Sequence, residues 1–263
     1  MTSCFWRSIF ARRELLWLLM VRNLTIRYKH SVLGFFWSLL GPLLMILIYA
    51  VFAHILRFQG SHPAYLPFLV SGLIVWHYLS LCLNDSLYSI AGSANLIKKT
   101  TFPRIILPMA MTFANLLNFL LTLVVLVAYL CFAGQTAQHI LWLPLLILTQ
   151  TALCLGLALV LSSLNVFFRD TEHLLGVGVL AWFFLTPVFY PLGRQLDMLP
   201  EYLHWMPFLN PMTGIVSSYR FILISDPLPM MLGLFISGGI SWVLLLFGAW
   251  LFQRLQIRFG DTL

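Results

Sequence analysis

Residues 105–168, IILPMAMTFANLLNFLLTLVVLVAYLCFAGQTAQHILWLPLLILTQTALCLGLALVLSSLNVFF, form a run of 64 residues without a single Asp, Glu, Lys or Arg. A charge at the centre of a lipid bilayer is costly, so such a run indicates membrane-embedded helix. A helix rises about 1.5 Å per residue and needs roughly 20 apolar residues to cross the hydrocarbon layer. The run is too long for one crossing, and its polar cluster at residues 134–139 (GQTAQH) predicts a turn between two spans.

The composition of the whole chain is that of a membrane protein. Of its 263 residues, 61% are hydrophobic and only 9% are charged, whereas soluble domains are roughly 45–50% apolar and about 25% charged. A soluble fold of this size cannot bury so much apolar surface in one core. These figures exclude a soluble enzyme, a disordered chain and a disulfide-stapled secreted domain.

Charge-free windows elsewhere raise the predicted number of spans to six. They cover residues 30–56, 58–84, 173–193 and 227–253. We therefore expect one all-α integral membrane domain over residues 1–263, with spans at about residues 35–56, 65–84, 105–132, 141–166, 173–191 and 229–253.

A proline-rich stretch separates the fifth and sixth predicted spans. Residues 187–229 hold seven of the 13 prolines, and a continuous lipid-exposed helix there would leave backbone groups without hydrogen bonds. We expect two short re-entrant helices in this outer region, residues 192–227, packed against protein rather than lipid.

The basic residues set the orientation, since Lys and Arg concentrate in cytoplasmic segments. With the N-terminus inside, the outer segments hold only Arg57, Arg194 and Arg220, and the other twelve basic residues fall on the cytoplasmic side. We therefore expect both termini in the cytoplasm. The net charge of +7 fits this topology and anionic membrane lipid, and it forms no continuous basic face of the kind that binds nucleic acid.

The first 29 residues interleave arginines with large apolar side chains. Their apolar run Leu15–Val21 is closed by Arg22 and lacks the small-residue site of a cleavable signal peptide. We expect residues 1–29 to form a helix in the plane of the inner membrane surface, with its arginines near the lipid headgroups.

Familiar catalytic motifs are missing from the sequence. It contains no G-x-x-x-x-G-K-[ST] nucleotide loop, no H-E-x-x-H zinc motif and no G-x-S-x-G nucleophile motif. No predicted span carries the buried carboxylate of an ion-coupled carrier; His54 and His77 are the nearest candidates for a proton relay, and each also fits a hydrogen-bonded histidine at a helix edge. We expect no enzyme activity, metal or cofactor in this chain, so energy for active transport must come from another chain.

A short cationic segment, residues 92–104, follows the second predicted span. Lys98, Lys99 and Arg104 surround Phe102, and Pro103 stops a helix. The segment fits an ordinary cytoplasmic loop, in which positive charge is expected. It also fits a helix that enters a cleft of a soluble motor and passes rigid-body motion to the spans.

Several segments, in order along the chain, resemble those of the ABC-2 permeases that export polysaccharides. Residues 92–104 resemble their coupling helix, and residues 27–37 (RYKHSVLGFFW), followed by Gly41-Pro42, resemble their approach to the first span. The other matching segments are residues 165–170 (NVFFRD), 186–191 (TPVFYP) with Pro200, Asn210-Pro211 and Arg220, and the tail 258–261 (RFGD). The likeness covers nearly the whole chain and is greatest to the membrane subunits that export lipid-linked O-antigen, with capsule and teichoic-acid exporters as relatives.

This resemblance implies a homodimer bound to two copies of a separate P-loop ABC ATPase, which binds the ATP and Mg²⁺. The implied cargo is an undecaprenyl-linked polysaccharide, carried across the bacterial inner membrane through a conduit lined notably by the first and fifth spans.

The resemblance also implies roles for three groups of residues. Coupling to the ATPase falls to Lys98, Lys99, Thr101, Phe102, Pro103 and Arg104. The conduit candidates are Trp182, Phe183, Phe184, Phe189, Tyr190 and Trp205, and the interfacial or gate residues are Arg27, Tyr28, Gly34, Trp37, Arg169 and Asp170. The rings equally fit an interfacial aromatic belt, and Arg169 with Asp170 also fits a charged pair that ends a span.

Other functions stay open as alternatives. An ABC-2 permease for teichoic acid, capsule, lipid or a drug shares the topology, although drug exporters usually carry a longer outer domain. An intramembrane lipid-carrier transferase needs a clustered acid, histidine or metal site, and a passive channel needs rings of charge or a polar filter. The sequence offers neither arrangement.

Overall fold

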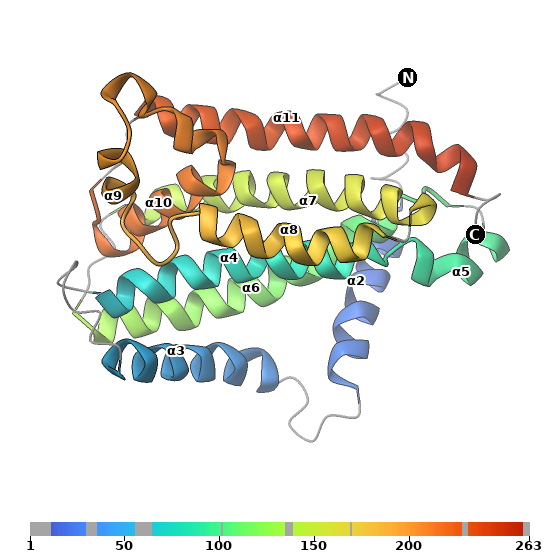
Figure 1. Cartoon of the computed structure of the whole chain (residues 1–263). Helices are drawn as coiled ribbons and strands as arrows, with labels where there is room; N and C mark the ends of the chain where they lie inside the picture. The colour runs from blue at the N-terminus through green and yellow to red at the C-terminus, as the bar shows by residue number, and fades with distance from the viewer. Residues whose placement is uncertain are drawn as a thin grey trace.

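The computed structural model describes residues 12–29, 36–55, 65–100, 102–134, 139–168, 170–227 and 231–259. Within these ranges every regular element is helical. The α-helices are α2 (Arg13–Tyr28), α3 (Trp37–Ile55), α4 (Tyr65–Leu87), α5 (Ala94–Lys99), α6 (Ile106–Phe132), α7 (Leu143–Phe167), α8 (Thr171–Leu185), α9 (Leu192–Asp197), α10 (Pro211–Ile224) and α11 (Met231–Leu255). Figure 1 shows the long helices side by side, with α5 at one end of the bundle and α9 at the other.

Four helices in the described ranges are long and apolar enough to cross a membrane. They cover Tyr65–Leu87, Ile106–Phe132, Ile140–Phe167 and Gly233–Arg258. This confirms the prediction of an all-helical membrane protein, while the number of six spans stays a prediction. The helix α3, 19 residues long, lies where the first span is predicted.

The helix α8 is shorter than the span predicted for residues 173–191. It has 15 residues and ends at Leu185, and at about 1.5 Å per residue this is less than the thickness of the hydrocarbon layer. Pro187 explains the end, because a proline disfavours helical backbone in the residue before it. The chain turns at residues 186–190 instead of continuing the helix.

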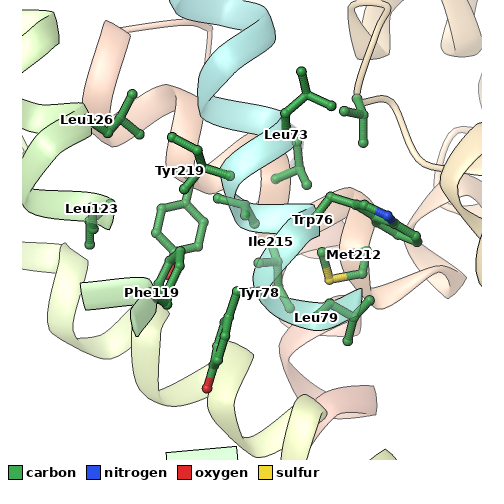
Figure 2. Packing of buried hydrophobic residues seen from close by; sticks show 14 of the residues in the cluster. Leu73, Trp76, Tyr78, Leu79, Phe119, Leu123, Leu126, Met212, Ile215 and Tyr219 are labelled. Carbon is green, nitrogen blue, oxygen red and sulfur yellow. The ribbon is translucent and has the colours of Figure 1, made fainter. Parts of the chain in front are cut away.

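The helix α4 forms the centre of the bundle, and 78% of its apolar 18-residue stretch is buried. Figure 2 shows its side chains Leu73, Tyr78 and Leu79 among residues of α6 and α10. The ring of Tyr78 stacks on that of Phe119 at 4.6 Å between centroids, and Phe119 meets Tyr219 edge to face at 6.0 Å. Offset and edge-to-face rings stabilise such contacts beyond the area they bury.

Two glycines allow α7 and α11 to cross at close range. A Cβ atom on Gly248 would lie 2.3 Å from the carbonyl oxygen of Gly156, and a Cβ atom on Gly156 would lie 2.7 Å from the backbone of Leu244. Small residues at a helix crossing let the two backbones approach closely. Such packing is important in a membrane, because lipid is as apolar as the helices and supplies no hydrophobic driving force for their association. Neither glycine can therefore be replaced without moving a backbone.

The helix α2 runs across the bundle rather than along it (Figure 1). Its Leu19 and Met20 are buried, whereas Trp17 and Leu18 are exposed. Leu19 joins a cluster at the α5 end of the bundle, together with Ile97 of α5, Ile106 of α6 and Phe252 of α11. The described part of residues 1–29 thus forms a helix over Arg13–Tyr28, and its place in the plane of the membrane surface stays a prediction.

The stretch between α8 and α11 folds into short helices at the opposite end. The six-residue α9 and two 3-10 turns, Glu201–Leu203 and Met206–Leu209, lead into α10. Twelve of the 14 residues of α10 are buried, and the helix packs against α4, α7 and α11. The prediction that this stretch packs against protein therefore describes α10, whereas no residue of α9 or of Glu201–Leu203 is buried. That these helices are re-entrant stays a prediction.

Candidate functional site

Arg220 is the most deeply buried charged side chain among the described residues, at 1% exposed. Its Nε donates to the carbonyl oxygen of Phe68 at 3.2 Å, and its two terminal nitrogens donate to those of Pro187 and Val188 at 2.6 Å each. The guanidinium also lies 3.4 Å from the centroid of the Phe68 ring. A buried charge is costly unless it is well partnered, and here backbone carbonyls and a ring face supply the partners.

Gly72 of α4 makes the space for this arginine. A Cβ atom at residue 72 would lie 2.6 Å from a terminal nitrogen of Arg220. Any larger residue therefore displaces the guanidinium from its carbonyl partners. Gly72 and Arg220 together connect α4, α10 and the turn after α8.

Asn210 makes a second connection in the same region. Its Oδ1 accepts hydrogen bonds from the indole nitrogen of Trp182 at 2.7 Å and from the backbone N–H of Met212 at 3.0 Å, which caps α10. Its Nδ2 donates to the hydroxyl of Thr186 at 2.9 Å. Asn210 thus satisfies a free N–H at the start of α10 and connects α10 to the end of α8. We call the side chains of Thr186, Asn210 and Arg220 the outer lock.

Four of the six predicted conduit rings form a connected group beside the outer lock. Trp182 and Phe183 both contact Trp76 of α4, at centroid distances of 5.8 and 5.3 Å. Phe183 also meets Phe184 at 5.6 Å and Phe189 at 5.0 Å. The other two conduit candidates, Tyr190 and Trp205, lie outside this group of rings. The hydroxyl of Tyr190 donates to the carbonyl of Phe184. Trp205 is half exposed between the two 3-10 turns.

One face of α8 carries an exposed apolar stripe. Within this helix only Thr171 and Leu175 are buried. The exposed side chains recur at helical spacing and are Leu174, Val177, Leu180, Phe184 and Leu185. A helix covered on one side only, in a chain that spans a membrane, meets either lipid or another protein surface with the other side.

A polar network joins three helices nearer the α5 end. Arg27 of α2 forms an ion pair with Asp85 of α4 and donates to Oδ1 of Asn115 on α6 at 2.9 Å. Asn115 in turn donates to Oδ2 of Asp85 at 2.8 Å. The side chains of Arg27 and Asp85 are 30% and 29% exposed, so solvent screens the pair and its contribution to stability is modest. We call Arg27, Asp85 and Asn115 the inner network.

The helix in the predicted coupling segment, residues 92–104, is shorter than expected. The helix α5 covers Ala94–Lys99 only, with Ile97 buried in the cluster at this end and Lys98 and Lys99 exposed. Thr100 has extended backbone, as the β-branched side chains of Thr100 and Thr101 favour.

The rest of the coupling segment packs inward. Phe102 lies half buried against the cluster at the α5 end, and Pro103 is also half buried. Arg104 donates to the carbonyl of Gln256, just after α11. Two further contacts hold this end together: Asn165 donates to the carbonyl of Leu87 at 3.1 Å, and a hydrogen bond to Glu172 raises the pKa of Tyr88.

The sequence was compared with known families and proteins. Residues 14–224 match the family described as ABC-2 type transporter. The chain belongs to the ABC-2 type transporter family. It is similar over 255 residues, at 33% identity, to the O-antigen export system permease protein RfbA of Klebsiella pneumoniae, with 95% of each chain covered. It is also 32% identical over 258 residues to the RfbA of Myxococcus xanthus, with 98% of each chain covered.

Membership of the ABC-2 family confirms the resemblance drawn from the ordered segments. The structure brings part of one of them together, since Thr186, Pro187, Asn210 and Arg220 all contribute to the outer lock or its partners. Lys98 and Lys99 lie on one exposed turn, while Phe102 and Arg104 face the protein itself.

The structure brings two of the predicted interfacial and gate residues together, since Arg27 and Trp37 line one cavity, whereas Asp170 does not line it. Arg27 belongs to the inner network, Trp37 is the first residue of α3 and is 43% exposed, and Asp170 directly precedes α8. Gly34, Arg169 and the coupling candidate Thr101 lie outside the described residues, as does the side chain of Tyr28.

Sequence reasoning missed Asp85, Asn115, Trp76 and Gly72. Asp85 carried one usable signal in the sequence: it is an acid at the end of a predicted span, and residues 1–29, predicted to lie on the same side of the membrane, contain several arginines. The other three have no distinctive spacing, because their roles depend on which helices pack together.

Proposed function

We propose that this chain is the permease subunit of an ATP-driven exporter of O-antigen, a lipid-linked polysaccharide carried across the bacterial inner membrane. The observation that carries the proposal is similarity along nearly the full length to two proteins named O-antigen export system permease. The four long apolar helices and the family membership support a transport subunit. The distribution of basic residues supports a multi-pass topology with both termini in the cytoplasm.

The energy comes from a separate ABC ATPase, which binds ATP and Mg²⁺ and docks at the α5 end. The sequence has no nucleotide loop of its own. Two adjacent lysines stand exposed on α5, a short helix fixed to the bundle by the buried Ile97. An anchored helix with an exposed charged turn is suited to pass the motion of a bound motor into the spans.

Transmission from α5 runs through contacts already described. The end of α4 that leads toward α5 is fixed by Asn165 of α7, which donates to the carbonyl of Leu87. On the other side of α5, Arg104 binds the chain after α11. A displacement of α5 therefore acts on α4, α7 and α11 together, which makes the α5 end the place where ATP hydrolysis moves the permease.

The working permease is a homodimer that binds two ATPase subunits. The exposed apolar stripe of α8 supports a partner surface, and α3 carries a similar one with Leu43, Leu47, Ile48 and Val51 exposed. These helices correspond to the first and fifth predicted spans. The conduit for the undecaprenyl-linked polysaccharide forms between the two copies, beside the aromatic group of α8.

Deletion of the gene tests this function in cells. We expect the cell surface to lose O-antigen while lipid-linked polysaccharide accumulates on the cytoplasmic side, because synthesis continues and export stops. Immunoblots of surface and membrane fractions measure both pools, and the wild-type gene on a plasmid serves as the control. Normal surface O-antigen in the deletion strain would refute the proposal.

A further inference from the structure

A half-open cavity of about 340 Å³ lies between α3, α4 and α6, next to the last turn of α2. This is within the range of small-ligand sites, about 300–1,000 Å³. Its wall includes the whole inner network together with His77, Thr122 and the ring of Trp37. The coupling and conduit roles described above do not use this cavity.

The polar side of the cavity carries no net charge. Arg27 and Asp85 neutralise each other in the ion pair. Among the described residues, both hydrogen bonds that Asp85 accepts end on Oδ2, so Oδ1 remains available as an acceptor. Uncharged hydroxyl groups can donate to Oδ1 of Asp85 and add hydrogen bonds without breaking the ion pair, whereas an anion would meet the carboxylate of Asp85 beside Arg27.

The other side of the cavity offers flat apolar surface. Trp37 is 43% exposed at the start of α3 and supplies most of this surface, because Tyr78 and Phe119, which also line the wall, stack on each other and are only 2% and 4% exposed. Aromatic faces pack well against flat apolar groups such as the C–H face of a pyranose ring. A pyranose ring has one such face and a rim of hydroxyls, which matches a site with rings on one side and a neutral donor-acceptor network on the other.

We infer that this cavity binds an uncharged sugar unit of the glycan cargo, with its ring against Trp37 and its hydroxyls on the inner network. The inference rests on the proposed export function and adds a specific subsite to it. The cavity lies toward the α5 end, where the cargo enters, and so the subsite acts before the conduit is reached.

Cysteine protection tests the subsite in the intact permease–ATPase complex in lipid nanodiscs. Thr122 lines the cavity, and Thr122→Cys supplies a near-isosteric thiol once the native Cys4 and Cys131 are replaced by Ser. The probe is the O-polysaccharide of the source strain, freed from its lipid by mild acid. When this polysaccharide fills about nine sites in ten, only about one thiol in ten is accessible. We therefore expect the reaction of the introduced thiol with methyl methanethiosulfonate to slow about tenfold.

Matched variants identify the side chain that matters. Trp37→Leu should abolish the protection because it removes the flat face, whereas Trp37→Phe should retain most of it. Trp142→Leu changes a tryptophan that is 62% exposed outside the cavity and should leave protection unchanged. Equal protection in the Trp37→Leu variant would overturn the inference, and so would an introduced thiol that never reacts, since the cavity would then be closed.

Two further probes test the chemical class. One probe is undecaprenyl diphosphate without sugar, and the other is phosphatidylethanolamine in place of the nanodisc lipid. Both should leave the labelling rate of the introduced thiol unchanged. If either protected the thiol and the glycan did not, the cavity would be assigned to a phosphate or a lipid headgroup instead. ATP-dependent export by the same preparation separates the two proposals. Export without glycan protection would overturn the subsite alone, whereas wild-type complex that exports nothing would overturn the function.

Discussion

Two arginines, Arg220 and Arg27, hold the two ends of the bundle together in different ways. Arg220 is almost fully buried and bound by three backbone carbonyls. Arg27 is about a third exposed, pairs with a carboxylate and an amide, and borders an open cavity. A buried charge fixed by backbone groups can leave its site only at high cost, while a partly solvated ion pair can open and reform. The comparison indicates that the end of the bundle at α9 is fixed, whereas the end at α5 is adjustable.

The largest effect is expected from removing Arg220. Arg220→Ala leaves three buried carbonyl groups without donors and a cavity beside Phe68, so we expect a loss of about 3–5 kcal/mol in the free energy of unfolding. Thermal unfolding of the detergent-purified protein measures it. Arg194→Ala, at an exposed position in α9, should change stability by less than about 0.5 kcal/mol. Equal melting temperatures for the two variants would mean that the outer lock is not a fixed structure.

A smaller loss is expected from filling the space that Gly72 leaves. Gly72→Ala places a methyl group 2.6 Å from the guanidinium, and overpacking of this kind costs about 1–3 kcal/mol. The matched control is Gly176→Ala in α8, where a Cβ atom meets nothing within 4 Å; this change should be neutral or slightly stabilising. If Gly72→Ala melted no lower than Gly176→Ala, Arg220 would have room to move.

The inner network should contribute less than the outer lock. A double-mutant cycle of Arg27→Gln and Asp85→Asn should give a coupling energy of about 0.5–1 kcal/mol, because the pair is partly solvated. Chemical unfolding of the four proteins in the cycle measures it. A coupling energy above about 3 kcal/mol, the size typical of a buried pair, would remove the contrast between the two ends.

The smallest effect on stability is expected at α5. The double variant Lys98→Glu and Lys99→Glu reverses two exposed charges, so the free energy of unfolding should change by no more than surface substitutions usually cause, about 0.5 kcal/mol. Export and copurification with the ATPase should nevertheless fail, because the docking surface has the wrong sign. Export at the wild-type rate would show that these lysines do not face the motor.

Much of the fold could be predicted from the sequence because lipid imposes strong rules on composition. Helices α6 and α7 lie where the uncharged run predicts two spans, and α10 is packed inside protein as the prolines indicate. The predicted fifth span runs to residue 191 because the hydrophobic run continues past Thr186, whereas α8 ends at Leu185; Pro187 is the signal in the sequence that marks this earlier end.

The contacts at the two ends were less predictable. Arg220 stood out as part of a family-like segment, but its partners are backbone carbonyls, which every residue possesses. Asp85 and Asn115 are 58 and 88 residues from Arg27 along the chain, and nothing in a single sequence pairs them. Phe102 was predicted to take part in coupling to the ATPase; it lies half buried against the cluster at the α5 end, a contact that nothing in a single sequence indicates, and its role in coupling stays a prediction.

Reconstitution of the permease with its ATPase tests the central claim most directly. Proteoliposomes are loaded with lipid-linked O-antigen on the side that carries the ATPase, and movement of the glycan to the opposite side is followed by its access to a glycosidase. We predict movement that requires ATP and stops when the catalytic lysine of the ATPase nucleotide loop is replaced. Movement that continues with the inactive ATPase, or none with the active complex and ATP, would contradict the account.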